Sequence, residues 1–471
     1  MYGDVNTSIE DGNLSSSNNK GTGIHVKIGI SAVSSDTPVC IKSSMTKDKI
    51  AERFGDSPLT DACLDSIEYG AKTIYCIPVT ASVNGMISEV AMTGESVGKV
   101  TVSGNAINAY DVVIEVIESG NTNVGTIKYS VDGGNSYSDE VTIPLSGKIV
   151  LGSTGLSVTF EDEEENESSF VEGTKYNFSV TAPAMSNEAV INAVESLRTF
   201  TEAFEFIHIV GITSSATWAS LAALADKFCL NYKKPLFFVC ESRNKGIDEE
   251  YTSYMVSMED SSKIIKNYSI EVVSSYATYV RTDGRIQDIN LAGIICGMYC
   301  NARESQSIGE VKSFFIPSSK LLKLLPEGIE DYTEQMDALR YTTIRQYYGK
   351  EDYYVTSANM MCPDGSDYRY AEDVRVLNRI VRQVRLQALN ELQTEIDPND
   401  IESSVATLKE ELSIPIDDAI EDGIISSGKV EIDTENVNIL ESEELDVQVT
   451  YVPMGHLRSI NIKFGVENPY S

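Results

Sequence analysis

The chain has 471 residues, of which 42% are hydrophobic and 23% charged, and its formal net charge is −34. This length predicts roughly two to four domains, and so large a negative charge repels nucleic acid and anionic lipid, so we expect neither as a direct partner. No stretch of about 18 apolar residues exists, which predicts no membrane insertion. Residues 1–24 lack the pattern of a signal peptide, which predicts synthesis in the cytoplasm.

The first part of the sequence predicts an arm followed by an α/β layer. Residues 1–24 are rich in Ser, Asn and Gly and predict an N-terminal arm. Strand and helix patterns then alternate in residues 25–90, which we interpret as the first half of an α/β core. The predicted segments are two strands, two short helices and a buried strand, at 25–33, 39–44, 46–55, 59–70 and 72–79.

Residues 91–183 change to an all-β pattern. About seven strand-like segments follow one another at roughly ten-residue spacing, separated by Gly-rich turns such as Asp132-Gly133-Gly134. This pattern predicts a small β-sandwich or barrel, with the acidic segment 161–167 as a solvated loop. Because α/β patterns stand on both sides, we predict that this module is inserted at an exposed loop of the core and faces outward.

The α/β pattern returns in residues 184–330, which we interpret as the second half of the core. Together with residues 25–90 they predict a mixed sheet with flanking helices. The predicted segments are helices at 186–200, 216–232 and 289–303 and strands at 204–211, 234–242 and 269–280.

Residues 331–452 predict an α+β C-terminal domain, and residues 453–471 predict a C-terminal arm. A long helix at 371–396 is the clearest element of this part. The other predicted segments are helices at 334–349 and 399–422 and strands at 351–362, 428–433, 445–452 and 457–466.

The sequence offers little that indicates chemistry. His25, His208 and His456 stand far apart, and the segment 94–99 (GESVGK) is one residue short of a phosphate-binding loop. Residues 132–140 lack the frame of a calcium loop. Eight scattered cysteines are expected to be reduced and buried, at positions Cys40, Cys63, Cys76, Cys229, Cys240, Cys296, Cys300 and Cys362. We therefore expect no catalytic residue, no metal and no cofactor.

The helix predicted at 371–396 carries a stripe of arginines. Arg375, Arg379, Arg382 and Arg385 fall at spacings of 4, 3 and 3, which places them on one face of a helix. The roughly opposite face is apolar, through Leu377, Ile380, Val381, Val384, Ala388 and Leu392. The stripe is either an ordinary solvated face or an electrostatic docking strip for an acidic surface.

The last segment of the chain alternates apolar and polar residues. The apolar positions, which are candidates for burial, are Leu457, Ile460, Ile462, Phe464 and Val466. Ten residues of strand reach about 33 Å. The segment can therefore complete a sheet of its own subunit or cross to a neighbouring subunit and add a strand there.

The order of four segments resembles the contractile tail sheath family, found in phage tails, R-type bacteriocins and related injection machines. The segments are 54–79 (FGDSPLTDACLDSIEYGAKTIYCIPV), 288–312 with its apolar AG helix, 334–389 with VRVLNRIVRQV, and the closing strands 445–466. Residues 1–24 and the SANMMCP segment depart from the family pattern. The chain is thus similar to a divergent member, with residues 91–183 as a variable insertion.

The resemblance implies a structural and mechanical role without enzymatic activity. Subunits of the family stack as rings, typically six-fold, around an inner tube, and exchanged terminal strands join neighbours. The implied partners are further copies of the chain, the inner tail tube protein, and baseplate and tail terminator proteins. The implied location is a virion tail, bacteriocin or injection particle that is assembled in the bacterial cytoplasm. The arginine stripe would then dock on the tube or on a neighbour.

Two other functions remain open from the sequence. The β module could serve a cell-surface or carbohydrate-binding protein, and the α/β core could carry an enzyme. Imaging of the purified protein separates these possibilities, because a sheath subunit is expected to form tubes or ring stacks.

Overall fold

The computed structural model describes residues 23–164, 166–433, 439–442 and 444–467. The predicted N-terminal arm, residues 1–24, lies almost wholly outside these ranges. Within them, no helix is both long and apolar enough to cross a membrane.

The core is a six-stranded sheet built from both halves of the predicted α/β region. Its order is β14-β13-β12-β1-β3-β2, with β2 antiparallel to β3 and the other neighbouring pairs parallel. The strands are β1 His25–Ile30, β2 Val39–Lys42, β3 Thr73–Val79, β12 Phe206–Ile212, β13 Phe237–Glu241 and β14 Ile270–Val273. Because β1 pairs with β12 across the inserted residues, the mixed sheet forms only when the two halves combine.

Helices cover both faces of this sheet. The helices α3, α4 and α5 pack on the face that presents Val26 and Ile28, while α1, α2 and α6 lie on the opposite face. Their bounds are α1 Lys47–Phe54, α2 Pro58–Glu68, α3 Asn187–Ser196, α4 Ser215–Leu230, α5 Tyr251–Ile264 and α6 Ala292–Asn301, with a 3-10 turn Leu197–Thr199 after α3. Ser57, Ser186 and Ser214 cap α2, α3 and α4 by accepting a backbone N–H in the first turn.

The inserted module is a sandwich and not a barrel. A five-stranded sheet, β4-β11-β6-β7-β8, faces a three-stranded sheet, β5-β10-β9, across an apolar core. The strands are β4 Ala91–Thr93, β5 Lys99–Gly104, β6 Tyr110–Glu118, β7 Thr126–Ser130, β8 Val141–Thr142, β9 Lys148–Val150, β10 Leu156–Glu161 and β11 Lys175–Val180. Both sheets have open edges among the described residues, so the barrel alternative is wrong.

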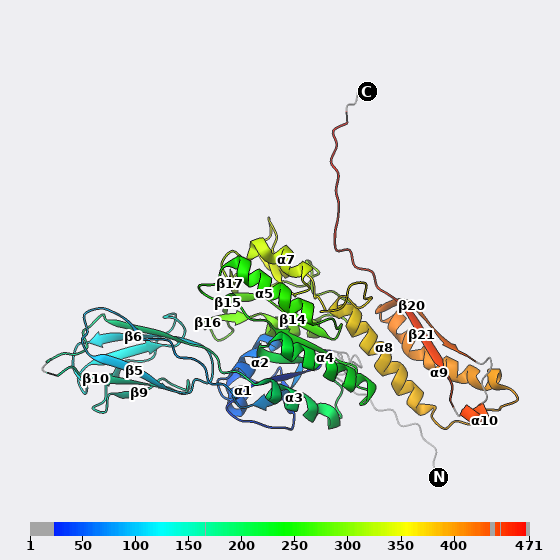
Figure 1. The fold of residues 1–471 in the computed structure, drawn as a ribbon, viewed down its shortest axis with the longest axis horizontal. Coiled ribbons are helices and arrows are strands. Elements are labelled where there is room, and N and C mark those ends of the chain that lie inside the picture. The colour runs from blue at the N-terminus through cyan, green and yellow to red at the C-terminus, as the bar shows by residue number, and fades with distance from the viewer. Residues whose placement is uncertain (1–22, 165, 434–438, 443, 468–471) are drawn as a thin grey trace, which may run out of the picture.

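The module stands at one end of the molecule, joined to the core by a narrow stalk (Figure 1). The outgoing and returning chains pair antiparallel there, through bridges between Val83 and Ala184 and between Ile87 and Val180. Beyond the stalk, Asn108 donates to the Asp61 carboxylate of α2 at 2.7 Å, and Ser153 donates to Asp56.

A second sheet lies beside the core. Its order is β16-β15-β17, all antiparallel, with β15 Tyr276–Val280, β16 Ile286–Asn290 and β17 Leu321–Leu325. The segment 269–280 was expected to form one strand. It forms two instead, because the chain leaves the core sheet after Val273 and enters the second sheet at Tyr276.

The predictions of a helix at 334–349 and a long strand at 351–362 are wrong. The helix α7 spans only Thr333–Ala338 after a 3-10 turn Ile329–Tyr332, and β18 Ile344–Gln346 then pairs with a short β19 Tyr353–Val355. Thr342 exchanges backbone hydrogen bonds with Val272 and Ser274 at 2.9 and 3.0 Å. This pairing with the edge of the core sheet overrides the helical pattern, as is common for β-branched segments.

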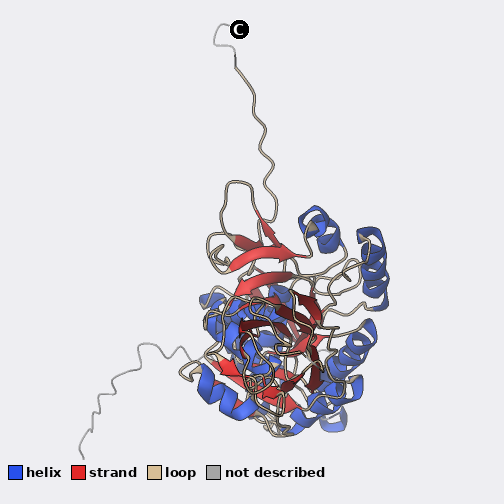
Figure 2. Cartoon of the chain, turned by 90° about the vertical axis from the view of Figure 1, so that its left-hand side faces the viewer, coloured by secondary structure: helices blue, strands red, loops and turns tan. Residues whose placement is uncertain are grey.

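The C-terminal part is a helical pair covered by a hairpin. The helix α8 Ala371–Asn390 packs against α9 Ile401–Glu421, and the two-stranded sheet of β20 Ile425–Ile432 and β21 Val447–Pro453 covers them, with α10 Ile439–Ser442 between its strands. The strand predicted at 457–466 is wrong for the subunit alone. Those residues run away from the molecule as an extended chain without regular structure (Figures 1 and 2).

Candidate assembly surfaces

The arginine stripe of α8 faces the core of its own subunit. Arg375 is fully buried and its Nε donates to the Glu205 carboxylate, which lies just before β12. The guanidinium also donates to the carbonyl oxygens of Tyr299 at 3.0 Å and Ala302 at 3.3 Å. A buried arginine of this kind cannot touch a second protein, so the docking hypothesis is wrong for Arg375 in this conformation.

The other three arginines of the stripe differ in how far they are free to contact a second protein. Arg379 pairs with Glu304 at 3.3 Å and with Asp422. Arg382 donates to the carbonyl oxygen of Phe204 at 3.1 Å, and burial lowers its pKa. Arg385 is half-buried and makes neither a hydrogen bond nor an ion pair with another described residue. Docking on another protein therefore stays a prediction that rests mainly on Arg385.

The apolar residues of α8 fall into two groups. Ile380, Val384 and Ala388 pack against α9 and the hairpin as predicted for a buried face. By contrast, Val381, Leu386 and Leu389 are exposed, as is Leu392, which lies beyond the end of α8 because the helix stops at Asn390. The helix thus presents apolar side chains to solvent near its C-terminal end.

Within the C-terminal arm, residues 457–467 carry a run of exposed apolar side chains at alternating positions. The exposed fractions are 80% for Leu457, 69% for Ile460, 67% for Ile462, 93% for Phe464 and 104% for Val466. Their predicted burial does not occur within the subunit. Apolar side chains so fully exposed on an extended backbone indicate a segment whose partner lies outside the subunit.

Gly23, at the start of the described chain, and His456, at the root of the C-terminal arm, both contact the end of α6 or the residues just after it. At the first described residue, the Gly23 amide donates to Glu205 at 3.0 Å, and its carbonyl accepts from the Cys300 thiol at 2.9 Å. At the root of the C-terminal arm, the His456 ring lies 2.8 Å from the Ser305 carbonyl oxygen, counted from Nε2. Residues 300–305 therefore contact the chain at the points where both terminal segments join the fold.

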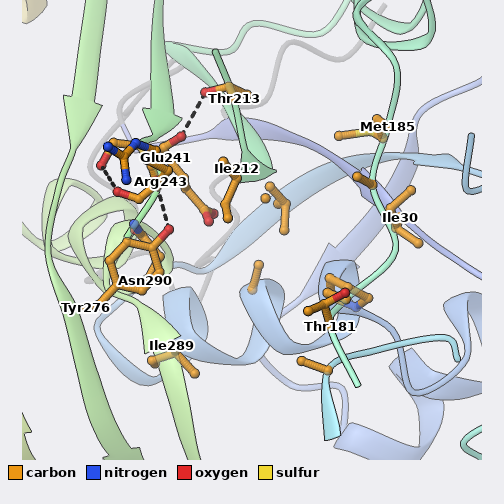
Figure 3. A pocket seen from close by; sticks show the side chains of 18 of the residues that line it. Ile30, Thr181, Met185, Ile212, Thr213, Glu241, Arg243, Tyr276, Ile289 and Asn290 are labelled. Atoms are coloured by element: carbon orange, nitrogen blue, oxygen red, sulfur yellow. Dashed lines mark hydrogen bonds between the residues drawn. The ribbon is translucent and has the colours of Figure 1, made fainter. Parts of the chain in front are cut away.

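A cavity of about 910 Å³ lies at the carboxyl ends of β1, β12 and β13. Figure 3 shows Glu241, Arg243 and Tyr276 on one side of it and Ile30 and Met185 on the other. This is the edge of a parallel sheet at which ligands of α/β proteins commonly bind. An enzyme with this sheet would be expected to bind its substrate at this edge.

Glu241 and Arg243, which line this cavity, are paired with other ionisable groups of the fold. Lys27 donates to His208 Nδ1 at 2.8 Å, and His208 Nε2 lies 3.0 Å from the Glu241 carboxylate, all of them buried. Burial raises the pKa of Glu241 to about 7. Arg243 forms two hydrogen bonds of 2.7 Å with Glu249. These pairs connect strands and loops within the fold, which is what buried charges do in structural networks.

The sequence did not indicate that a histidine and a cysteine would meet. His25 Nδ1 lies 3.4 Å from the Cys300 thiol, and Cys63 and Cys76 bring their sulfurs to 3.3 Å. All eight cysteines are free thiols. No cluster of three or more His, Cys, Asp or Glu side chains that could hold a metal occurs in the described part of the chain.

The fold is similar to that of a chain found in a contractile assembly. A chain of the anti-feeding prophage baseplate in the contracted state, solved by cryo-electron microscopy, matches with a TM-score of 0.55 and 10% identity, over 99% of this chain and 97% of that chain. This match shows a shared fold with a chain of a contractile baseplate, which is the kind of assembly that the resemblance to the contractile tail sheath family implies.

Two sheath tail proteins also match. The protein from Desulfitobacterium hafniense has 14% identity and a TM-score of 0.49, with 96% of this chain and 100% of that chain covered. The protein from Listeria innocua has 13% identity and a TM-score of 0.49, with coverages of 93% and 96%.

The sequence matches two family profiles, described as "DUF2586, N-terminal domain" over residues 2–359 and "DUF2586, C-terminal domain" over residues 367–471. The chain therefore belongs to the DUF2586 family. A comparison with curated proteins found no match.

Proposed function

We propose that this protein is the structural subunit of a contractile tail sheath. Its subunits stack as rings, typically six-fold, around an inner tube protein, and contraction drives the tube through a cell envelope. The observation that carries the proposal is the C-terminal arm, which leaves the subunit with every apolar side chain from Leu457 to Val466 exposed.

The subunit also offers an edge that such an arm can extend. The strands β20 and β21 pair with each other, and among the described residues each has one edge without a strand partner. A free edge and a free alternating strand on the same subunit are complementary, because strand addition satisfies the backbone of both. A donor and an acceptor at different places on one surface make a heterologous contact, which builds open stacks and helices.

Contraction would follow from the contacts between subunits. The extended sheath is metastable on this proposal, and a baseplate trigger releases it into a shorter and wider lattice. The free energy then lies in the assembly, so that no nucleotide or other cofactor is needed. The sheath end meets baseplate and tail terminator proteins, and Arg385 is the member of the arginine stripe left to contact the tube or a neighbour.

Truncation after Ser459 tests the role of the arm. This cut removes the alternating segment but keeps Arg458 and His456, which contact the subunit. We expect a folded, soluble protein with a near-normal melting temperature that no longer forms tubes or ring stacks in negative-stain images. Sheaths formed by the truncated protein would show that the arm does not join subunits.

A matched pair of substitutions refines this test. Ile462→Asp places a charge at an apolar position of the arm, whereas Asn461→Asp places the same charge at the adjacent polar position. Strand addition buries alternate side chains, so we expect the first variant to lose assembly and the second to keep it. Equal loss in both variants would point to charge alone.

The same preparation addresses the alternative of a cell-surface or carbohydrate-binding protein that uses the β module. That alternative expects monomers that bind glycans through residues 91–183, with or without the C-terminal arm. Binding to a glycan array together with an absence of polymers at all concentrations would favour it.

A further inference from the structure

The root of the C-terminal arm is held by its own subunit at Arg458. The Arg458 guanidinium donates to the Glu372 carboxylate at 2.5 Å and lies over the ring of Tyr370, 3.4 Å from its centroid. Two residues earlier, His456 contacts the Ser305 carbonyl oxygen. The side chain of Arg458 is 29% exposed, whereas the apolar side chains that follow it are all at least 67% exposed.

The surroundings of Glu372 favour the binding of a cation. It stands in the first turn of α8, is 2% exposed, and its second oxygen, Oε2, is buried without a hydrogen-bond donor among the described residues. A buried carboxylate is costly without a paired cation. Tyr370 adds an aromatic face beside it, and an aromatic ring with a carboxylate is the combination that suits a planar guanidinium.

We propose that Tyr370 and Glu372 form a guanidinium-binding site, which the subunit fills with its own Arg458. The site marks the end of the anchored chain and fixes the direction in which the free arm starts at Ser459. Its value for assembly rests on the proposed function, but its occupation by Arg458 can be tested on single subunits.

The charges around Glu372 make the loss of Arg458 from the site unfavourable. Glu372 lies among the carboxylates of Glu271 on β14 and Asp373 on α8, with Arg375, His456 and Arg458 as the nearby cationic or titratable groups. If Arg458 leaves, Glu372 loses the cation that reaches its carboxylate. The arm therefore leaves the subunit in one direction until a stronger interaction displaces Arg458 from Glu372. The site acts as a latch for the arm in this sense.

Trypsin tests the latch directly, because it must take Arg458 into its own binding pocket before it cleaves. Lys463 is a second trypsin site five residues further along the same arm. A synthetic peptide of residues 452–471 gives the intrinsic ratio of cleavage after Arg458 and after Lys463. In the folded, unassembled subunit, followed by mass spectrometry, we expect cleavage after Arg458 to be slowed roughly tenfold or more relative to that ratio.

The variant Glu372→Gln keeps the size of the side chain and removes its charge. We expect it to restore the peptide's ratio at Arg458, while the matched control Glu421→Gln, an exposed change on α9, leaves the protection intact. Protection of Arg458 that is absent in the wild type or unchanged in Glu372→Gln overturns the proposal. If Glu372→Gln fails to fold, the wild-type comparison with the peptide still decides. None of these readouts depends on polymer formation, so failure of the sheath proposal would be seen separately.

Discussion

At the scale of single residues, arginines of α8 form ion pairs with carboxylates of their own strongly acidic chain. Arg375 reaches Glu205 and Arg379 reaches Glu304, so both find carboxylates within their own fold. These pairs tie the C-terminal part to the core sheet. The stripe therefore contributes to the internal structure of the subunit before it contributes to any contact between subunits.

Removal of the Arg375 charge should be strongly destabilising. Arg375→Met keeps much of the volume but leaves the Glu205 carboxylate buried and unpaired, which costs roughly 3–5 kcal/mol. The control Arg385→Met should change the stability by no more than about 0.5 kcal/mol. Urea denaturation of the two variants and the wild type measures the difference.

A double substitution checks the cause of that loss. Arg375→Met with Glu205→Met removes both charges, so the penalty of an unpaired carboxylate disappears and part of the stability should return. If Arg375→Met unfolds at the same urea concentration as Arg385→Met, the pair does not hold α8 in place.

The sequence predicted that these arginines share a helix face but could not predict what they face. Glu205 lies 170 residues before Arg375, and no local pattern connects the two positions. The only local signal was a glutamate within the apolar run FEFIHIV, since a charge inside a buried strand needs a partner. In the arm, alternation predicted burial of Ile460, Ile462 and Phe464, which the single subunit leaves exposed, so their burial in an assembly stays a prediction.

At the scale of elements, local signals were reliable where packing agreed with them. The helix α3 begins at Asn187, within one residue of the predicted start at residue 186, and β1, β12 and β13 coincide with apolar runs. Local signals failed where pairing with residues distant in the sequence determined the secondary structure. Residues 341–344 become extended because Thr342 pairs with the end of β14, which lies about 70 residues earlier.

The stalk of the β module predicts that the module can be removed. The chains at Val83 and Ala184 are paired by backbone hydrogen bonds of 3.1 and 2.9 Å, so a short Gly/Ser turn can join them in place of residues 84–183. The module has its own apolar core and its removal leaves the core sheet intact. We expect a folded protein that still polymerises, as seen by negative-stain microscopy.

A control variant separates the loss of a single hydrogen bond from the loss of the whole β module. The deletion removes the hydrogen bond from Asn108 to Asp61, so Asn108→Ala in the full chain measures what this contact contributes to the melting temperature. A deletion variant that folds but forms no polymer, next to an Asn108→Ala variant that assembles, would mean that the module takes part in the lattice.

At the scale of the whole molecule, a net charge of −34 opposes the packing of many copies. Salt screens repulsion between exposed charges, and the screening length falls from about 20 Å at 0.02 M to about 6 Å at 0.3 M. We therefore expect added salt to lower the subunit concentration at which polymers appear in light scattering. The truncation after Ser459 should stay unassembled at every salt concentration. The opposite salt effect would mean that opposite-charge pairs dominate the contacts between subunits.

The contacts of Gly23 and His456 with residues 300–305 have a mechanical consequence. If neighbours pull on the two arms of one subunit, the tension enters near Gly23 and Cys300 and leaves near Ser305 and His456. Because Gly23 also binds Glu205, next to β12, and stands two residues before β1, this load enters the core sheet as well as the end of α6. A subunit connected in this way can transmit traction along a filament through its core, while the β module, joined through its stalk at Val83 and Ala184, lies outside the path between the two ends.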